Sequence, residues 1–185
     1  NKIINMEIKF KRLSDKAVLP IRAHKSDAGL DLTATDIKLE LNERNQTIIV
    51  YHTDLAVEIP EGYVGLLFPR SSISNKTLTL TNCVGVIDSG YRGEILAKFR
   101  NTTDVVPSAY NVGEKFAQLL IMPLADITVA EAADLSESER GEGGFGSTDE
   151  KEVSAAAGSD SETAESSDQT VPEQAADLKQ SETAA

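Results

Sequence analysis

The sequence predicts an all-β domain of the sandwich or barrel type. Apolar and polar residues alternate with a period of two in several short segments, which is the pattern of half-buried strands. Turn residues recur about every ten residues, as in antiparallel sandwiches and barrels and unlike chains that alternate strands with helices. The turn signals lie at Asn42–Asn45, Pro60–Gly62, Ser89–Gly90 and Asn111–Gly113.

The predicted strands follow one another from residue 6 to residue 122. Ile37–Leu41 alternates strictly, and Thr47–Tyr51 is rich in β-branched and aromatic residues, which favour strands. One short helix is predicted to begin near Ser71. The other predicted strands are Met6–Leu13, Leu55–Ile59, Tyr63–Phe68, Thr77–Thr81, Glu94–Phe99 and Phe116–Met122.

The charge is unevenly distributed along the 185 residues, whose formal net charge is −12. Residues 149–185 hold ten acidic residues and two lysines, a charge of −8, so the first 148 residues carry −4. We expect an extension at 1–5, a β domain at 6–134, a mobile C-terminal arm at 135–148 and a disordered acidic tail at 149–185, since the tail lacks the apolar residues for a core. The tail either solvates the chain or binds a partner.

Composition excludes several classes of function. The acidic balance argues against direct nucleic-acid binding, which needs a basic surface. The single cysteine, Cys83, cannot form an intrachain disulfide, which favours a reducing compartment, and no apolar run reaches the roughly 18 residues of a membrane span. We therefore predict a cytoplasmic protein without membrane contact, starting naturally at Met6. With nine aromatic residues and no tryptophan, the core is thin, which favours an oligomer.

Five segments carry residue types suited to chemistry, and each has a structural alternative. Asp31 lies between two leucines in Asp27–Leu32, so it is either a hydrogen-bonded structural carboxylate or a site group. In Pro69–Ser72, Arg70 precedes two hydroxyls at a predicted helix start, a pattern that can hold a phosphate. The alternative is an ordinary serine cap beside a surface arginine.

The third and fourth segments are Asn82–Gly93 and Gly113–Ile121. Asn82–Gly93 predicts a hairpin with Asp88 at its rim and Tyr91 folded back over the concavity. A carboxylate there either activates water or simply forms the turn. Gln118 is the only amide in an apolar strand, so it needs a partner, either in the core or on a ligand.

The fifth segment is Arg140–Thr148, in which four glycines surround Phe145. Such a loop can approach a phosphate through its backbone amides while the phenylalanine covers a base. It lacks the lysine of a Walker A motif, so a P-loop is not predicted. The alternative is a flexible tail.

In order and approximate spacing, these five segments resemble the five motifs of the trimeric all-β dUTPases, over about residues 6–148. The resemblance implies a distorted jelly-roll (dUTPase-like β-clip) subunit in a homotrimer with exchange of C-terminal arms. It implies Mg²⁺-assisted hydrolysis of dUTP to dUMP and pyrophosphate, which limits uracil in DNA and supplies dUMP for thymidylate synthesis.

The resemblance also implies residue roles. Asp88 would be the catalytic base that activates the water attacking the α-phosphorus, and Tyr91 would lie under the deoxyribose and exclude a 2′-hydroxyl. Asp31 would support the Mg²⁺ through coordinated water. The other implied substrate-binding residues are Asn82, Gly85, Val86, Ile87 and Phe145 for uracil, and Arg70, Ser71, Ser72, Gln118, Arg140, Gly146, Ser147 and Thr148 for the phosphates.

The chain departs from the family pattern at three places, none of which removes a reacting group. Ser72 stands where many relatives have glycine, Gly90 where several bacterial relatives have aspartate, and Lys115-Phe116 where arginine-isoleucine is common.

Three other classes of protein share parts of this pattern. dCTP deaminases share the fold but carry a catalytic glutamate ten residues after the motif aspartate, where this chain has Lys98. A regulatory protein that switches repressors through its dUTP-bound state could coexist with catalysis. A purely structural β trimer would not need Asp88, Tyr91 and Arg140 together.

Overall fold

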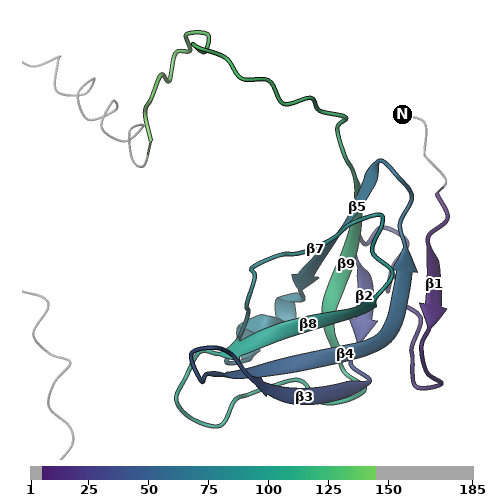
Figure 1. Ribbon diagram of the computed structural model, residues 1–185. Helices are drawn as coiled ribbons and strands as arrows, with labels where there is room; N and C mark the ends of the chain where they lie inside the picture. Colours follow the sequence, from purple (N-terminus) through teal and green to yellow (C-terminus); the bar gives the residue numbers. More distant parts are fainter. Residues whose placement is uncertain (1–5, 145–185) are drawn as a thin grey trace, which may run out of the picture. The chain divides into compact units, whose positions relative to one another are not determined.

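The computed structural model describes residues 6–144, in which two antiparallel sheets pack face to face (Figure 1). The first sheet has the order β1 (Lys9–Arg12), β4 (Thr47–Glu58), β8 (Glu94–Asn101) and β6 (Leu78–Leu80), and β3 (Asp36–Leu41) also pairs with β4. The second has the order β2 (Leu30–Thr33), β9 (Lys115–Pro123), β5 (Tyr63–Pro69) and β7 (Gly85–Ile87). The predicted all-β class is confirmed.

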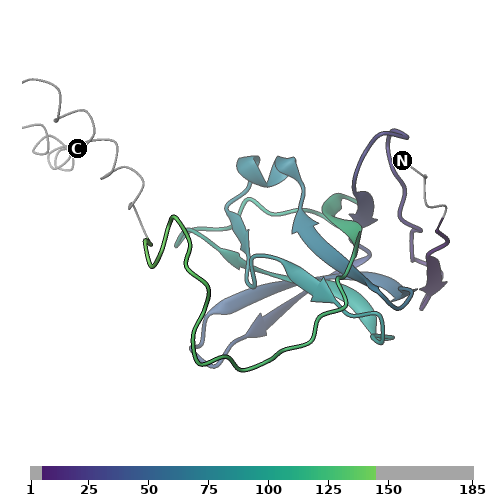
Figure 2. The same ribbon diagram turned by 90° about the horizontal axis from the view of Figure 1, so that it is seen from above.

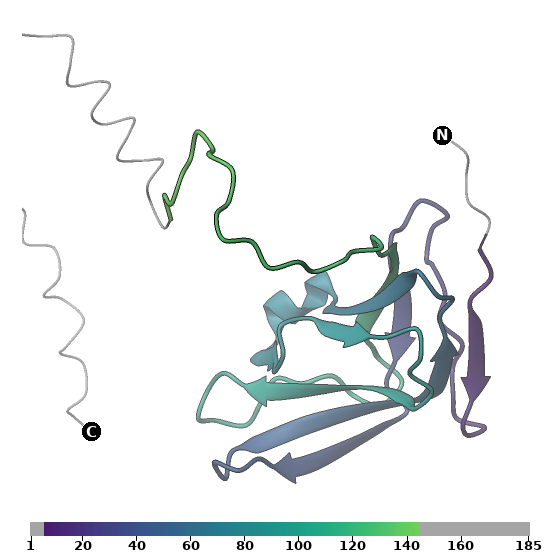
Figure 3. The same ribbon diagram turned by 45° about the horizontal axis from the view of Figure 1, so that its top comes forward.

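One short 3₁₀ helix, η1 (Ser71–Asn75), follows β5 at the predicted place (Figures 2 and 3). Within residues 6–144 no helix is long and apolar enough to span a membrane. By its internal contacts the chain divides into two units at Val129, and residues 124–144 contain neither strand nor helix.

β4 is one strand of twelve residues, where the sequence predicts two separate strands. Residues 47–52 pair with β3 and β8, and residues 55–58 pair with β1. The register with β8 shifts between His52 and Ala56, and Asp54 has a φ of 52°. Four residue steps from His52 to Ala56 oppose two steps in β8, so this β-bulge contains two extra residues. Such a bulge bends the strand and interrupts its pairing, which divides β4 into the two segments that the sequence predicts.

The other differences are at the ends of elements and in one connection. β1 covers only part of the predicted Met6–Leu13, and β2 is a strand that the alternation analysis misses because it has only four residues. The predicted hairpin at Asn82–Gly93 is wrong in its pairing: β7 pairs with β5, whereas β8 belongs to the other sheet. Asp88–Gly93 therefore carries the chain from one sheet to the other.

The core lies between the sheets and is centred on aromatic rings. Tyr51 and Phe99 from the first sheet and Phe116 from the second are completely buried. Tyr51 stacks on Phe116 at 4.9 Å between centroids and meets Phe99 edge to face at 5.4 Å. The Tyr51 hydroxyl accepts the Tyr110 N–H at 3.0 Å and donates to its carbonyl at 3.3 Å, so this polar group is satisfied inside the core.

We expect Tyr51→Phe to lower the free energy of unfolding by roughly 1–3 kcal/mol, because the Tyr110 backbone groups lose their partner. Burial raises the pKa of Tyr51 above its ordinary value of 10.0. Its contribution is thus complete below that pH and is lost as the pH rises through the raised pKa. Urea unfolding at neutral and alkaline pH measures both effects. Tyr63→Phe, at the margin of the core, is the control, and equal loss in the two variants would contradict the assignment.

Candidate active site

The first group of candidate residues gathers around Asp31 on the second sheet. Asp31 on β2 is opposite Gln118 on β9, which is opposite Phe68 on β5, so Arg70 emerges close by at the end of β5. Arg70 Nε donates to Asp31 Oδ1 at 2.8 Å, and Lys115 Nζ donates to Asp31 Oδ2 at 2.9 Å. We call Asp31, Arg70, Lys115 and Gln118 the Asp31 cluster.

The Asp31 cluster has the charge of an anion site. The Asp31 side chain is only 12% exposed, whereas Arg70 and Lys115 are 33% and 36% exposed. One carboxylate between two cations leaves the cluster with a net positive charge. The side chains of Arg70 and Lys115 are partly exposed, so their remaining N–H groups can reach a ligand. A guanidinium held in place in this way is suited to bind phosphate oxygens with little loss of side-chain entropy.

Gln118 is held by the backbone rather than by the apolar core. Its Nε2 donates to the Pro69 carbonyl at 3.0 Å. A Cβ on Gly29 would lie 2.4 Å from Gln118 Oε1, so the glycine is needed to admit the amide. Close packing against Gln118 of the fourth segment thus explains why the first segment has a glycine at position 29.

Ser72 has a structural partner, which differs from its expected role. Its hydroxyl lies 3.0 Å from the Tyr110 hydroxyl, while the preceding Ser71 is exposed. The residue that caps η1 is Arg70, with no side-chain capping hydrogen bond, so the alternative of an ordinary serine cap is not what the structure shows. Ser72 lines a hollow together with Arg70 and Lys115, but its hydroxyl is already paired with Tyr110.

The second group of candidate residues forms a hollow of about 180 Å³ around β7. Asn82, Asp88 and Tyr91 line it and are exposed, as is the apolar Val86. We call it the Tyr91 hollow. Its other lining residues are Leu67, Gly85, Ile87, Glu94, Ile95 and Leu96.

β7 lies at the edge of its sheet, with β5 as its only strand partner among the described residues. The N–H and C=O groups on its outer side therefore have no strand to pair with and face the surroundings of the hollow. The turn before it contains Cys83 at a φ of 61°. That turn brings Asn82 back to the same hollow as Gly85.

The Asp31 cluster and the Tyr91 hollow are separate within one chain. Ile87 is opposite Gly65, whereas Gln118 is opposite Phe68, so Asp88 is displaced by roughly 13 Å along the strands. Three strand spacings, roughly 14 Å, also separate β2 from β7. The Tyr91 hollow alone is too small for a whole nucleotide, since its volume is below the roughly 300–1,000 Å³ of usual ligand pockets. A larger hollow of about 580 Å³ lies beside Arg70 and Lys115 of the Asp31 cluster.

The fifth segment lies only partly within the described residues. Arg140 is exposed, and its Nε donates to the Gly143 carbonyl at 2.8 Å. The expected substrate contacts of Phe145, Gly146, Ser147 and Thr148 lie outside the described residues.

The described residues fit a magnesium ion that is held largely by the phosphates of a bound substrate. Residues 6–144 contain no group of three or more metal-binding side chains. Both oxygens of Asp31 are paired with cations, but a carboxylate has about four lone-pair positions and can also accept a metal-bound water. Mg²⁺ commonly keeps several waters and binds through one or two carboxylates together with substrate phosphates.

An all-β fold with a phosphate-type cation cluster, a small polar hollow and an exposed carboxylate defines a candidate nucleotide hydrolase. The family model for dUTPase matches residues 15–149, and the chain belongs to the dUTPase family. It is an enzyme family, and the fold is the distorted jelly roll of these trimeric proteins.

Named relatives and solved structures that are similar to this chain are also dUTPases. The deoxyuridine 5′-triphosphate nucleotidohydrolase of Thermobifida fusca is 39% identical over 145 residues, covering 77% of this chain and 79% of the relative. That of Mycobacterium sp. strain JLS is 40% identical over 144 residues, covering 74% and 91%. A mutant Staphylococcus bacteriophage 80alpha dUTPase with dUpNHpp is 32% identical at a TM-score of 0.67, covering 78% and 99%.

A second solved structure concerns a metal. It is a mutant dUTPase from phage phi11 of S. aureus with a structural Mg(II) ion, 31% identical at a TM-score of 0.58, covering 70% of this chain and 98% of that one.

Two groups of contacts in the structure are not predicted by the sequence patterns. Lys115 pairs with Asp31, although the two are 84 residues apart and no local pattern links them. Glu94 binds His52 and the backbone of the β4 bulge. No local pattern marks this contact either, because Glu94 begins β8 and both strands contain other polar residues.

Proposed function

We propose that the protein hydrolyses dUTP to dUMP and pyrophosphate with Asp88 as the general base. The observation that carries the proposal is that Asp88 and Tyr91 line one hollow beside the outer edge of β7, which pairs with no other strand within residues 6–144. A carboxylate that is exposed in a hollow can reach a bound water, and the neighbouring groups suit a nucleoside.

The hollow suits a uracil ring attached to deoxyribose. Uracil offers an N–H flanked by two carbonyls, which matches the alternating donors and acceptors of a free strand edge. Asn82, Gly85, Val86 and Ile87 are the proposed uracil contacts. Cytosine would leave buried polar groups unpaired, and the extra methyl of thymine would overlap a rigid strand.

The phosphates are proposed to lie on the Asp31 cluster. Arg70, Ser71 and Gln118 would contact their oxygens, with Asp31 holding the arginine in place. Bound Mg²⁺ would supply charge neutralisation of the phosphate chain, with Asp31 touching only its coordinated water. Arg140 and residues 145–148 would cover the substrate from the arm, with Phe145 on the base.

In the proposed reaction, the oxygen of a water forms a bond to the α-phosphorus. Asp88 accepts the proton of that water, and the bond from the α-phosphorus to the α–β bridging oxygen breaks. The electron pair leaves with pyrophosphate. Asp88 thus orients the water and removes its proton.

We propose a homotrimer in which one copy supplies the Asp31 cluster and a neighbour supplies the Tyr91 hollow. The separation of these two groups within the chain supports this arrangement. In the cell, the reaction would limit uracil in DNA and supply dUMP for thymidylate synthesis.

The experiment that tests the reaction is pyrophosphate release with Mg²⁺ from dUTP, dCTP, dTTP and UTP. We expect release from dUTP alone. Ammonia from dCTP would overturn the proposal in favour of a deaminase. A deaminase would need a glutamate where this chain has Lys98, and the Lys98 ammonium forms an ion pair with Glu40.

The two serines after Arg70 give a further prediction. Ser71→Ala should lower kcat/KM for dUTP by about tenfold, since its exposed hydroxyl is a proposed phosphate contact. Ser72→Ala should change it less than about threefold, because its hydroxyl is already paired with Tyr110. Steady-state kinetics of the two variants decides this, and the reverse order would restore Ser72 as the phosphate contact.

A further inference from the structure

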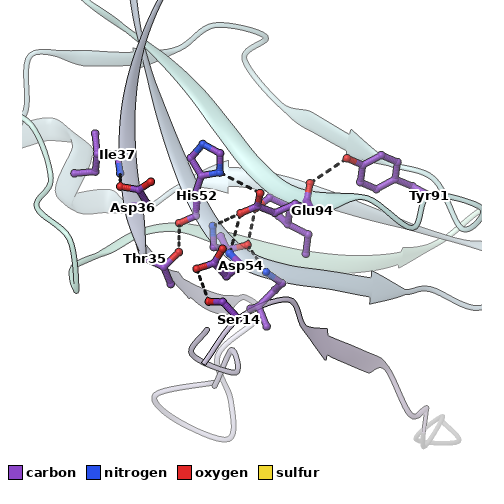
Figure 4. A network of polar contacts seen from close by, with 11 residues as sticks. Ser14, Thr35, Asp36, Ile37, His52, Asp54, Tyr91 and Glu94 are labelled. Carbon is purple, nitrogen blue, oxygen red and sulfur yellow. Dashed lines mark hydrogen bonds and ion pairs between the residues drawn. The ribbon is translucent and has the colours of Figure 1, made fainter. Parts of the chain in front are cut away.

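Glu94 links the Tyr91 hollow to the bulge in β4 (Figure 4). Its Oε1 accepts the backbone N–H groups of Thr53 and Asp54 at 3.1 Å and 2.9 Å. Its Oε2 lies 3.0 Å from His52 Nδ1. Although Glu94 begins β8, both oxygens of its carboxylate are therefore fastened to β4.

These contacts replace backbone pairing that the bulge removes. The ladder between β4 and β8 is interrupted between His52 and Ala56, and the left-handed Asp54 turns its N–H out of register. Thr53 is completely buried, so its amide cannot turn to water. Because an unsatisfied buried amide is costly, the Glu94 carboxylate has one strongly preferred place.

Because the Glu94 side chain is held against β4, the Glu94 main chain is held in place as well, and this main chain binds Tyr91. The Tyr91 hydroxyl donates to the Glu94 carbonyl at 3.0 Å, as Figure 4 shows. The ring also lies against Gly93: a Cβ there would be 2.4 Å from the Tyr91 hydroxyl and 2.6 Å from Cζ. Gly93 and Glu94 thus set where the ring lies, and neither contact involves the substrate.

We propose that Glu94, supported by His52, is a positioning residue for Tyr91 that sets the discrimination between deoxyribose and ribose. The inference rests on the proposed function, in which Tyr91 lies under the sugar. Rejecting one hydroxyl by overlap requires a ring that cannot yield, and a misplacement of about 1 Å is enough to change such a contact strongly. The bulge in β4 holds the Glu94 carboxylate in place, and Glu94 in turn holds the Tyr91 ring.

The test compares kcat/KM for dUTP and UTP in Glu94→Ala, Glu94→Gln and His52→Ala. We expect Glu94→Ala to lower the ratio of dUTP to UTP by about tenfold, mainly because UTP gains. Glutamine keeps an oxygen for the two amides, so Glu94→Gln should retain the ratio within about twofold. His52→Ala should fall between them. Glu40→Ala, which removes an exposed carboxylate bound to β8, is the control and should leave the ratio unchanged.

A double-mutant cycle with Tyr91→Phe separates positioning from general destabilisation. Phenylalanine keeps the ring but loses the hydroxyl bond to Glu94, so Glu94→Ala should reduce the ratio little further in that background. Equal losses for both substrates in Glu94→Ala, or additive effects in the cycle, would overturn the inference. Should Glu94→Ala not fold, the cycle is run with His52→Ala, which leaves both amide bonds in place.

Failure of the proposed function gives a different result. A wild type that releases no pyrophosphate from dUTP refutes the reaction but not the positioning. Calorimetric binding of dUDP and UDP to the wild type and Glu94→Ala then measures the same sugar discrimination. Unchanged relative affinities in that experiment would refute the positioning.

Discussion

Asp88→Asn is expected to lower kcat for dUTP about a thousandfold while KM changes little. Asparagine preserves the size of the side chain but cannot take a proton, and a general base commonly contributes a factor of about 10²–10⁴. Asp88 is exposed in the Tyr91 hollow, so the substitution leaves no buried group unpaired and should not affect folding. Pyrophosphate release and thermal unfolding of the same preparation measure the two quantities.

Asp104→Asn, an exposed aspartate outside both groups of site residues, is the matched control. It should retain wild-type kcat. An Asp88→Asn variant with kcat within about tenfold of the wild type would show that another group activates the water.

Mixed trimers of Arg70→Ala and Asp88→Asn are expected to regain activity that neither variant has alone. Each proposed site takes the Asp31 cluster from one copy and the Tyr91 hollow from the next. In any mixed trimer, one of the three sites then combines an intact cluster with an intact hollow. Trimers purified through two different affinity tags should therefore show about a third of the wild-type activity.

The matched control mixes Arg70→Ala with Gln118→Ala. Both substitutions damage the Asp31 cluster, so no mixed trimer contains an intact one. These trimers should remain at the level of the single variants. Equal recovery in both mixtures, or none in the first although mixed trimers form, would contradict a site shared between copies.

The sequence alone predicts the fold class and the residues that the structure places at two surface sites. The predicted strands include β3, β5, β8 and β9, and β8 alternates between buried and exposed side chains as a half-buried strand should. β3 also forms, but Leu39 and Leu41, which the alternation assigns to one apolar face, are exposed. The prediction fails at β4, where the bulge interrupts the pairing inside one long strand, and at β7, whose three residues pair with β5 rather than with the next strand in sequence. Pairing is a long-range choice, so a local pattern does not contain it.

The site residues divide in the same way. Motif spacing identifies Asp31, Arg70 and Asp88 as unusual, because each is a polar residue beside apolar segments or a turn. It cannot show that Lys115 reaches Asp31, or that Ser72 is paired with Tyr110. Those contacts join residues 84 and 38 positions apart.

What the sequence by itself determines is thus the set of chemical groups, the strand-forming segments and membership of the dUTPase family. Only the tertiary structure decides that the Asp31 cluster and the Tyr91 hollow lie at different places on one chain. Only it reveals the support of Tyr91 by Glu94 and the β4 bulge. The physical reason is that side-chain chemistry and alternation are local properties, whereas hydrogen-bond partners and sheet order depend on which distant segments pack together.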